Sequence, residues 1–216
     1  MTALMERNKT GKGQCVQGSL LGTALTFANS TLIEQEVIEI DRVGSGNRGQ
    51  AAAPADVYKT KDGWVLVQAL GQPLFARWCK LIGEDHWLED PRFATDILRG
   101  ENSKIISARM TEWTEQRSTD DVILALEKER IPAGPVLSPR EALVDPQVLA
   151  GSYMQDVDYP GIGRPAPLSK TPVRLSETPG EIRHRAPLLG EHTDQIMTEL
   201  GYSPDEIMDL RGKRVI

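Results

Sequence analysis

The sequence predicts a compact α+β unit over residues 50–150, built from one hairpin or small sheet and several helices. The first observation is a hairpin signal. Asp62-Gly63 lies between two runs rich in Val, Tyr and Trp, and glycine accepts the positive φ that tight turns demand. We expect strands at Asp56–Thr60 and Trp64–Leu70. The second observation is that apolar residues after the hairpin recur at helical spacing, which is typical of helices with one buried face.

Composition excludes several classes of function. The chain has 216 residues, enough for one large domain or two small ones, and its net charge of −6 and lack of a basic stripe argue against a nucleic-acid partner. Apolar runs such as Gly18–Ala28 are too short to span a membrane, and charged Met1–Lys12 does not resemble a signal peptide. Cys15 and Cys79 are isolated, which favours neither a disulfide nor a metal site and indicates a cytoplasmic setting.

The first thirty residues predict helices without a clear sheet. Met1–Asn8 is typical of the end of a helix, and the glycines of Thr10–Gly13 stop it. We expect a short strand at Gln14–Val16 and a packed helix at Ser19–Ser30, which is rich in Leu, Ala and Thr. A chain that opens within a helix suggests that a preceding segment is missing or comes from a partner.

Three helices follow the hairpin in the prediction. The first, Gln72–Ile82, places four apolar residues on one face: Phe75, Trp78, Cys79 and Ile82. The second, about Glu101–Arg117, buries Ile106, Met110 and Trp113. The third starts after Ser118, a plausible N-cap, and runs to Arg130.

The rest of the chain alternates extended and helical pieces. Its prolines predict an extended Ile131–Val136 and short helices that begin at Ser138-Pro139 and at Asp145-Pro146. Residues 153–188 are expected to form a long return segment with strand-like pieces at Met154–Tyr159 and Pro172–Leu175. Two helices end the chain. One carries Ile196, Met197 and Leu200, and the other has a capping box of Ser203 and Glu206 with Pro204 at its first position.

A glycine-containing loop precedes the hairpin. It carries Gly44, Gly46 and Gly49, then Gln50, three alanines and Pro54. Small side chains would let backbone N–H groups approach an anionic or carbonyl ligand, so a flap beside a site is one interpretation. A solvent-exposed linker between domains is the other.

Side-chain chemistry alone shows no complete active site. His86, His184 and His192 are scattered along the chain and form no metal-binding spacing. His192 stands at a helix entrance, where a capping or packing role is expected. Ser19 lacks the glycines of a nucleophile elbow. Acidic pairs such as Asp120-Asp121 suit the first turn of a helix.

An ordered set of short motifs carries a resemblance that covers nearly the whole chain. The motifs are Thr10-Gly11-Lys12-Gly13-Gln14, Gly46-Asn47 through Ala53-Pro54, Tyr58 through Gly63, Asp90-Pro91-Arg92-Phe93, Ile131 through Val136, Asp145-Pro146-Gln147, and Arg185 through Thr193 followed by Leu200-Gly201. Together they resemble the family III CoA-transferases, which include formyl-CoA transferase, carnitine CoA-transferases and α-methylacyl-CoA racemase. The Arg185–Thr193 block is the most specific of them.

The resemblance implies an α/β fold in which an α+β small domain joins a Rossmann-like large domain, within a dimer of interlocked rings. It divides this chain into the end of a first large-domain segment (1–41), the small domain with its glycine loop and hairpin (42–150), and a return segment with terminal helices (151–216). Family members are much longer, and this chain is similar to their C-terminal half. Their N-terminal half supplies the aspartate that forms acyl-aspartyl and aspartyl-CoA intermediates. The resemblance therefore implies no catalytic residue here, and a homodimer or partner chain that supplies the other half.

The resemblance also implies that the glycine loop is a lid that shields the acyl-enzyme intermediate from water. The lid and substrate-binding positions are Gly46, Asn47, Gly49, Gln50, Ala51 and Ala52. This run holds fewer glycines than in formyl-CoA transferases, which puts formyl-CoA as substrate in doubt. Gln17 replaces a usual Asp, and about Gly71 replaces the glutamate of the racemases. The loss of that proton-transfer group favours a transferase over an acyl-CoA racemase.

Two functions remain open. In the first, the chain is part of an enzyme that moves CoA between a thioester and a carboxylic acid, with CoA as substrate and no other cofactor. In the second, it is a non-catalytic remnant or assembly subunit that keeps the small-domain scaffold. If half of the large domain is missing, Met1–Ser30 and Met154–Leu210 should expose apolar faces, so we expect the isolated chain to self-associate or to be marginally stable.

Overall fold

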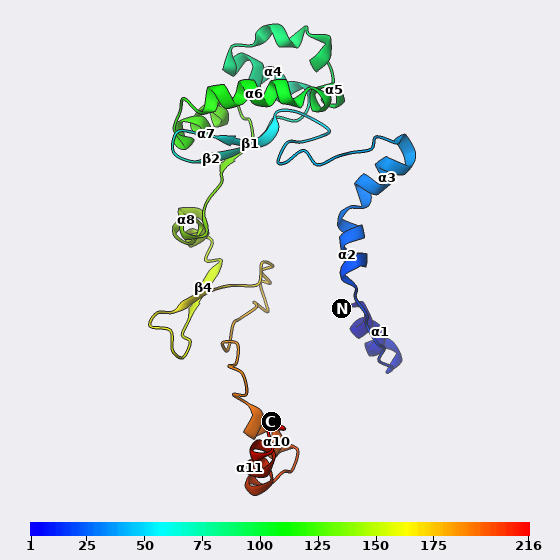
Figure 1. Cartoon of the computed structure of the whole chain (residues 1–216), viewed down its shortest axis with the longest axis vertical. Helices are drawn as coiled ribbons and strands as arrows, with labels where there is room; N and C mark the ends of the chain where they lie inside the picture. The colour runs from blue at the N-terminus through cyan, green and yellow to red at the C-terminus, as the bar shows by residue number, and fades with distance from the viewer. The chain divides into compact units, whose positions relative to one another are not determined.

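The computed structural model describes all 216 residues and divides the chain into two compact units, Met1–Val136 and Leu137–Ile216. Figure 1 follows the path of the chain through both. The three-part division at residues 1–41, 42–150 and 151–216 rests on the path of the family's chain and stays a prediction.

The sheet of the first unit confirms the predicted hairpin. Strands β1 (Ala55–Lys59) and β2 (Trp64–Gln68) pair antiparallel, with Val57 opposite Leu66, and β3 (Ala133–Pro135) adds to the other edge of β2. The turn is held by Asp62, whose carboxylate accepts hydrogen bonds from the N–H and hydroxyl of Thr119 at 2.8 Å each. These bonds lower the pKa of Asp62 and join the hairpin to the start of the next helix.

Helices α4 (Gln72–Ile82), α6 (Ser103–Thr114) and α7 (Thr119–Lys128) pack on this sheet and on one another (Figure 1). The predicted apolar face of α4 is buried as expected. Ser118 caps α7 by accepting the N–H of Asp121. Between α4 and α6 lie two short 3₁₀ turns, Asp85–Leu88 and Pro91–Phe93.

One core joins the sheet and these helices. Its aromatic part brings the Trp87 and Phe93 rings to 4.8 Å between centroids, and the Phe75 and Trp78 rings to 5.7 Å. Further buried residues of this core come from β2, α6, α7 and the segment before β3: Val65, Val67, Ile106, Met110, Val122, Leu126 and Ile131. The α+β prediction for this region is confirmed.

The predicted helix at Glu101–Arg117 is wrong in its bounds. The structure has α5 (Asp96–Glu101) and α6, separated at Asn102. Thr95 caps α5 by accepting the N–H of Leu98 at 3.3 Å, so a separate short helix precedes α6, and α6 itself is shorter at both ends than predicted. Ile106, Met110 and Trp113 are buried as predicted.

The N-terminal residues differ more from the prediction. Helix α1 (Thr2–Thr10) ends at Gly11 as expected, but Gln14–Val16 is not a strand, because it has no strand to pair with. The helix expected at Ser19–Ser30 is α2 (Leu20–Phe27), and a further helix, α3 (Asn29–Ile38), follows it. Neither helix has a buried residue, so the prediction of a packed helix is wrong.

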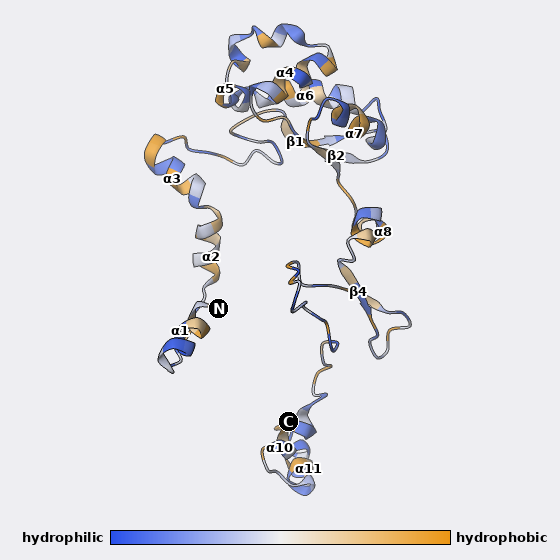
Figure 2. Ribbon diagram, turned by 180° about the vertical axis from the view of Figure 1, so that it is seen from behind, coloured by the Kyte–Doolittle hydropathy of each residue, from blue (hydrophilic) through white to orange (hydrophobic).

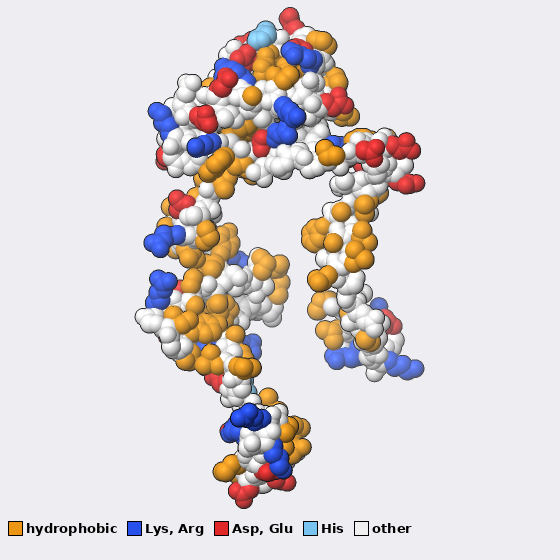
Figure 3. All heavy atoms as spheres, viewed as in Figure 1, with side chains coloured by type: hydrophobic (Ala, Val, Ile, Leu, Met, Phe, Trp, Pro, Cys, Tyr) orange, Lys and Arg blue, Asp and Glu red, His pale blue; other side chains and the backbone are white.

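Apolar residues along α2 and α3 are exposed instead, as Figures 2 and 3 show. Leu20 is 93% exposed and Phe27 is 87% exposed. This agrees with the expectation that Met1–Ser30 presents an apolar face.

The second unit begins with α8 (Pro139–Val144) and α9 (Pro146–Ala150), where both predicted proline-led helices are found. Strand β4 (Met154–Val157) confirms one strand-like piece, and it pairs with β5 (Ala166–Ser169). The strand predicted at Pro172–Leu175 is absent, since β4 already has its partner and the chain bends there.

The last helices are α10 (Thr193–Glu199) and α11 (Pro204–Gly212), and α11 has the predicted capping box. His192 occupies the N-cap position of α10, but its side chain makes no capping hydrogen bond. In the whole chain, none of the helices reaches the length and apolar character needed to cross a bilayer.

Candidate active-site loop

The glycine loop, residues 41–54, connects α3 to β1 in the first unit. Its tip is a turn at Gly46 and Asn47, both exposed, where Gly46 has a φ of +69° that favours glycine. Toward the hairpin the loop becomes buried, and Ala52, Ala53 and Pro54 have little exposed surface. The predicted lid residues therefore span an exposed tip and a fixed base.

Arg42 anchors the start of the loop to α3. Its guanidinium binds the carboxylate of Glu34 through two N–H groups, one of them 2.6 Å from Oε1. The hydrogen bonds from Arg42 lower the pKa of Glu34 and those to Glu34 raise the pKa of Arg42. Both groups stay charged at neutral pH, so Glu34 is an acceptor in this pair and not a proton donor.

Gln50 closes the base of the loop. Its amide Nε2 donates to the carbonyl of Val43 at 2.5 Å and to Oγ of Ser45 at 3.1 Å. Its Oε1 lies 3.4 Å from Nη1 of Arg42. Ser45 in turn donates to the carbonyl of Arg48 at 2.8 Å. One side chain thus holds residues from both arms of the loop and contacts the anchoring arginine.

Glycine is required at two positions where backbones meet. A Cβ on Gly49 would lie 2.8 Å from the Cβ of Ala55 and 2.9 Å from the carbonyl oxygen of Ala52. A Cβ on Gly100 of α5 would lie 2.3 Å from the carbonyl oxygen of Gln50. Side chains do not tolerate such distances. Gly49 therefore lets the loop pack against Ala52 and Ala55, and Gly100 lets it pack on α5.

Two cavities border the loop. One of about 610 Å³ is lined by Ser30, Thr31, Glu34, Arg42, Val43, Gly44, Gln50 and Ala51. A smaller one of about 230 Å³ is lined by loop residues together with Gly100, Glu101 and Ser103. Arg42 and Gln50 line both. The loop can therefore present amide and guanidinium donors to a ligand with carbonyl or anionic oxygens, but it holds no activated nucleophile or base.

The structure brings together the six predicted lid positions with three residues that the sequence did not single out, Glu34, Arg42 and Gly100. The sequence offered one weak indication of Arg42, its position at the start of the glycine loop. Glu34 and Gly100 carry no signal of their own, since Glu34 meets Arg42 only through the turn of the chain after α3 and Gly100 meets the distant Gln50.

Two of the three histidines are not scattered. His184 and His192 line one pocket of about 610 Å³ in the second unit, with Arg185, Pro187, Glu191 and Gln195. Glu191 accepts hydrogen bonds from Arg185 and from the N–H of Leu188 at 2.7 Å, and these lower its pKa to about 2. This explains the compact turn that the Arg185–Thr193 motif forms.

Gly71, which stands near the place of the racemase glutamate, has a φ of +81° and begins α4. Its N–H lies 3.1 Å from the carboxylate of Asp96, to which it donates. The backbone conformation favours glycine there, so a carboxylate side chain at residue 71 itself would be strained.

The fold and loop define an α+β unit in which a glycine loop feeds an antiparallel hairpin covered by helices. The sequence profile described as CoA-transferase family III matches residues 1–193. Succinyl-CoA--D-citramalate CoA-transferase of Chloroflexus aurantiacus is 31% identical over 218 residues, which cover 100% of this chain and 54% of that protein. Formyl-CoA:oxalate CoA-transferase of Bradyrhizobium diazoefficiens is 30% identical over 237 residues, with 97% and 54% covered.

A solved structure of a CAIB/BAIF family protein from Brucella suis is similar with a TM-score of 0.71 and 28% identity, over 92% of this chain and 51% of that chain. The chain belongs to CoA-transferase family III. It spans about half the length of the curated relatives it matches.

Proposed function

We propose that this chain is part of an enzyme that moves CoA between an acyl-CoA thioester and a carboxylic acid. The observation that carries the proposal is the family match over residues 1–193, which includes the whole glycine loop and hairpin. Two relatives of about 30% identity are named as CoA-transferases for succinyl-CoA and formyl-CoA. In this proposal coenzyme A is a substrate, and no other cofactor takes part.

The proposed chemistry uses an aspartate that residues outside this chain supply. Its carboxylate attacks the thioester carbonyl and forms a mixed anhydride while CoA leaves as the thiolate. The thiolate then attacks the aspartyl carbonyl, which releases the first acid and leaves an aspartyl-CoA thioester, and the acceptor acid reverses the two steps. The proposal assigns the aspartate to residues outside this chain because the family resemblance puts it in the N-terminal half, and this chain is similar to the C-terminal half and spans about half the length of its curated relatives.

The glycine loop serves as the lid in this reaction. Gly46 and Asn47 form its exposed tip, Gly49 and Gln50 are half-buried, and the loop becomes buried from Ala52 onward, whereas Ala51 stays exposed. A mixed anhydride hydrolyses readily in water, so a cover over the intermediate protects it during transfer. The loop's N–H donors and Arg42 suit a ligand with anionic or carbonyl oxygens. A homodimer, or a partner chain, would complete the site.

Label exchange tests the proposal. The chain is mixed with succinyl-CoA and ¹⁴C-succinate, alone and after co-expression with the polypeptide encoded immediately upstream, and label entering succinyl-CoA is measured. We expect exchange only in the co-expressed sample. Borohydride reduction and mass spectrometry should then find the trapped thioester on an aspartate of the partner polypeptide.

Each other outcome has a definite meaning. Exchange by the chain alone would place the nucleophile within these 216 residues and overturn the external aspartate. CoA binding without exchange of succinate, oxalate or another acid, in a folded co-purified complex, would favour the non-catalytic assembly subunit.

A further inference from the structure

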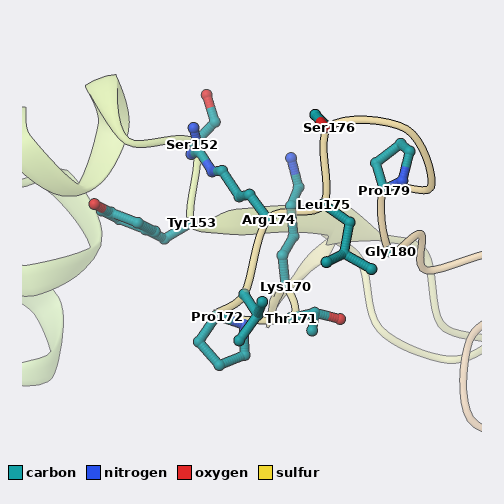
Figure 4. A pocket seen from close by; sticks show the side chains of 11 residues that line it. Ser152, Tyr153, Lys170, Thr171, Pro172, Arg174, Leu175, Ser176, Pro179 and Gly180 are labelled. Atoms are coloured by element: carbon teal, nitrogen blue, oxygen red, sulfur yellow. The ribbon is translucent and has the colours of Figure 1, made fainter.

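A further pocket, separate from the three described above, lies in the unit formed by Leu137–Ile216. It has a volume of about 540 Å³ and forms between Ser152-Tyr153 and the segment that follows β5 (Figure 4). The N–H of Lys170 donates to the carbonyl of Tyr153 at 2.8 Å, which extends the β4–β5 pairing to the edge of the pocket.

The chain folds back on itself to form the far wall. A Cβ on Gly180 would lie 2.9 Å from Oγ1 of Thr171. The two ends of this segment therefore approach closely, which the absence of a side chain on Gly180 permits. Leu175, Ser176 and Pro179 line the opposite side in Figure 4. The pocket is thus built by one continuous segment and the strand end that precedes it.

The charges of the pocket are all positive. Lys170 and Arg174 line it, no Asp or Glu does, and neither cation takes part in an ion pair. Figure 4 shows both side chains extending to the same side of the pocket. Arg174 donates to the carbonyl of Gly151 and lies 5.7 Å from the centroid of the Tyr153 ring, which orients its guanidinium and leaves most of its N–H groups free.

Hydroxyl groups complete the donor set. Ser152, Thr171 and Ser176 line the pocket, and none of the three hydroxyls has a hydrogen-bond partner within the chain. Two cations without a carboxylate, next to free hydroxyls, match the oxygens of a phosphate, because charge-assisted bonds from Arg and Lys are stronger than bonds between neutral groups.

We propose that this pocket binds a phosphate group. The same chemistry is offered by a free phosphate anion and by a phosphate-bearing coenzyme. If the proposed function holds, the 3′-phosphate and the pyrophosphate of CoA are available ligands, but the pocket itself does not depend on CoA transfer.

Calorimetry with inorganic pyrophosphate at low ionic strength tests the site on the full chain. Lys170→Gln and Arg174→Gln should each weaken binding about tenfold or more, the lower end of what one charge-assisted hydrogen bond contributes. Arg183→Gln is the matched control. Arg183 lies in the same unit, is 79% exposed, and pairs with Glu181 at 3.9 Å outside the pocket. Its substitution should leave pyrophosphate binding unchanged.

A comparison of CoA with dephospho-CoA distinguishes the sources. Stronger binding of CoA, lost in Arg174→Gln, would assign the site to the 3′-phosphate. Equal binding of the two, with pyrophosphate binding intact, would assign it to a diphosphate or a free anion. The proposal is overturned if folded wild-type chain does not bind pyrophosphate, or if the Lys170→Gln, Arg174→Gln double variant binds it as well as wild type. Both side chains are exposed, so circular dichroism should show unchanged folding in every variant.

Discussion

The carbonyl oxygen of Gln50 lies so close to the α-carbon of Gly100 that a Cβ at residue 100 would come within 2.3 Å of it. Gln50 belongs to the glycine loop, whereas Gly100 belongs to helix α5. The two residues are far apart in the sequence, and their contact seats the base of the loop on the helical layer. The position of the glycine loop therefore depends on residue 100 of α5 having no side chain.

Gly100→Ala should destabilise the first unit. Alanine is the better helix former by about 1 kcal/mol, but the collision with the loop backbone should outweigh this gain and give a net loss of about 1–3 kcal/mol. All four tryptophans, Trp64, Trp78, Trp87 and Trp113, lie in the first unit, so urea unfolding followed by tryptophan fluorescence reports on it.

Gly212→Ala is the control for this substitution. Gly212 also lies in a helix, α11, but a Cβ there would have no atom within 4 Å. It should leave the fluorescence transition unchanged. An equal or higher urea midpoint for Gly100→Ala would show that the loop shifts without loss of stability. The contact between Gln50 and Gly100 would then not fix the base of the loop on α5.

Gly49→Val should slow turnover in the reconstituted transferase while CoA affinity stays nearly unchanged. The added side chain would displace the loop from Ala52 and Ala55, and a displacement of about 1 Å near a reacting group can lower a rate about 100-fold. Turnover is measured by steady-state label exchange, and affinity by calorimetry.

Gly44→Val serves as the matched variant in the same loop, because a Cβ on Gly44 would meet nothing within 4 Å and its φ is not positive. It should keep most of the activity. Equal losses of turnover and CoA affinity in Gly49→Val would argue that the loop binds CoA directly and is not a lid.

The elements that could be predicted are those whose causes lie within a few residues. The apolar face of α4 and the Ser118 and Ser203 caps depend on near neighbours in the chain, and so does the choice of Asp62-Gly63 for the turn, although Thr119 adds distant hydrogen bonds to it. Each of them was found where the sequence placed it.

The features that could not be predicted depend on distant partners. Helix α2 has an apolar composition that indicates burial, yet Leu20 is 93% exposed, because burial requires a second surface and not composition alone. The split between α5 and α6 lies at Asn102, whose side-chain amide donates to the carbonyls of Leu98 at 2.9 Å and of Arg92 at 3.2 Å, ten residues away. In the candidate site, the sequence identified the loop but not Glu34 or Gly100, whose roles come from contacts across the fold.

Arg99→Met should destabilise the first unit by about 1–3 kcal/mol, because it removes the donor and leaves the buried acceptors of Arg99 without a hydrogen-bond partner. Arg99 is 1% exposed, and its Nη1 donates to Oε1 of Gln72 at 2.8 Å and to the carbonyl of Phe93 at 2.7 Å. Its guanidinium also lies 4.6 Å from the centroid of the Phe75 ring. Tryptophan fluorescence during urea unfolding measures the change.

Arg92→Met provides the comparison. Arg99 pairs with Asp96, and Arg92 likewise pairs with Asp90 and lies 5.3 Å from the centroid of the Phe93 ring, but the Arg92 side chain is 55% exposed. Water solvates the exposed pair, so its loss should shift the urea midpoint far less than the loss of Arg99. Similar shifts for the two variants would mean that burial does not decide the strength of these contacts.

The Arg185–Glu191 pair should remain intact in mild acid. The hydrogen bonds from Arg185, and then that from the Leu188 N–H, lower the pKa of Glu191 to about 2, so the folded state favours the charged carboxylate. Its stabilising effect is therefore fully present above the ordinary carboxyl pKa of about 4.3 and is lost as the pH falls through the lowered value.

An NMR titration of the Glu191 carboxyl carbon should give a midpoint near pH 2 in the native chain. Arg185→Met should move that midpoint upward toward the ordinary value while α10 stays folded. A midpoint that is ordinary in the wild-type chain, or that does not move in the variant, would show that Arg185 does not hold the turn before α10 in solution.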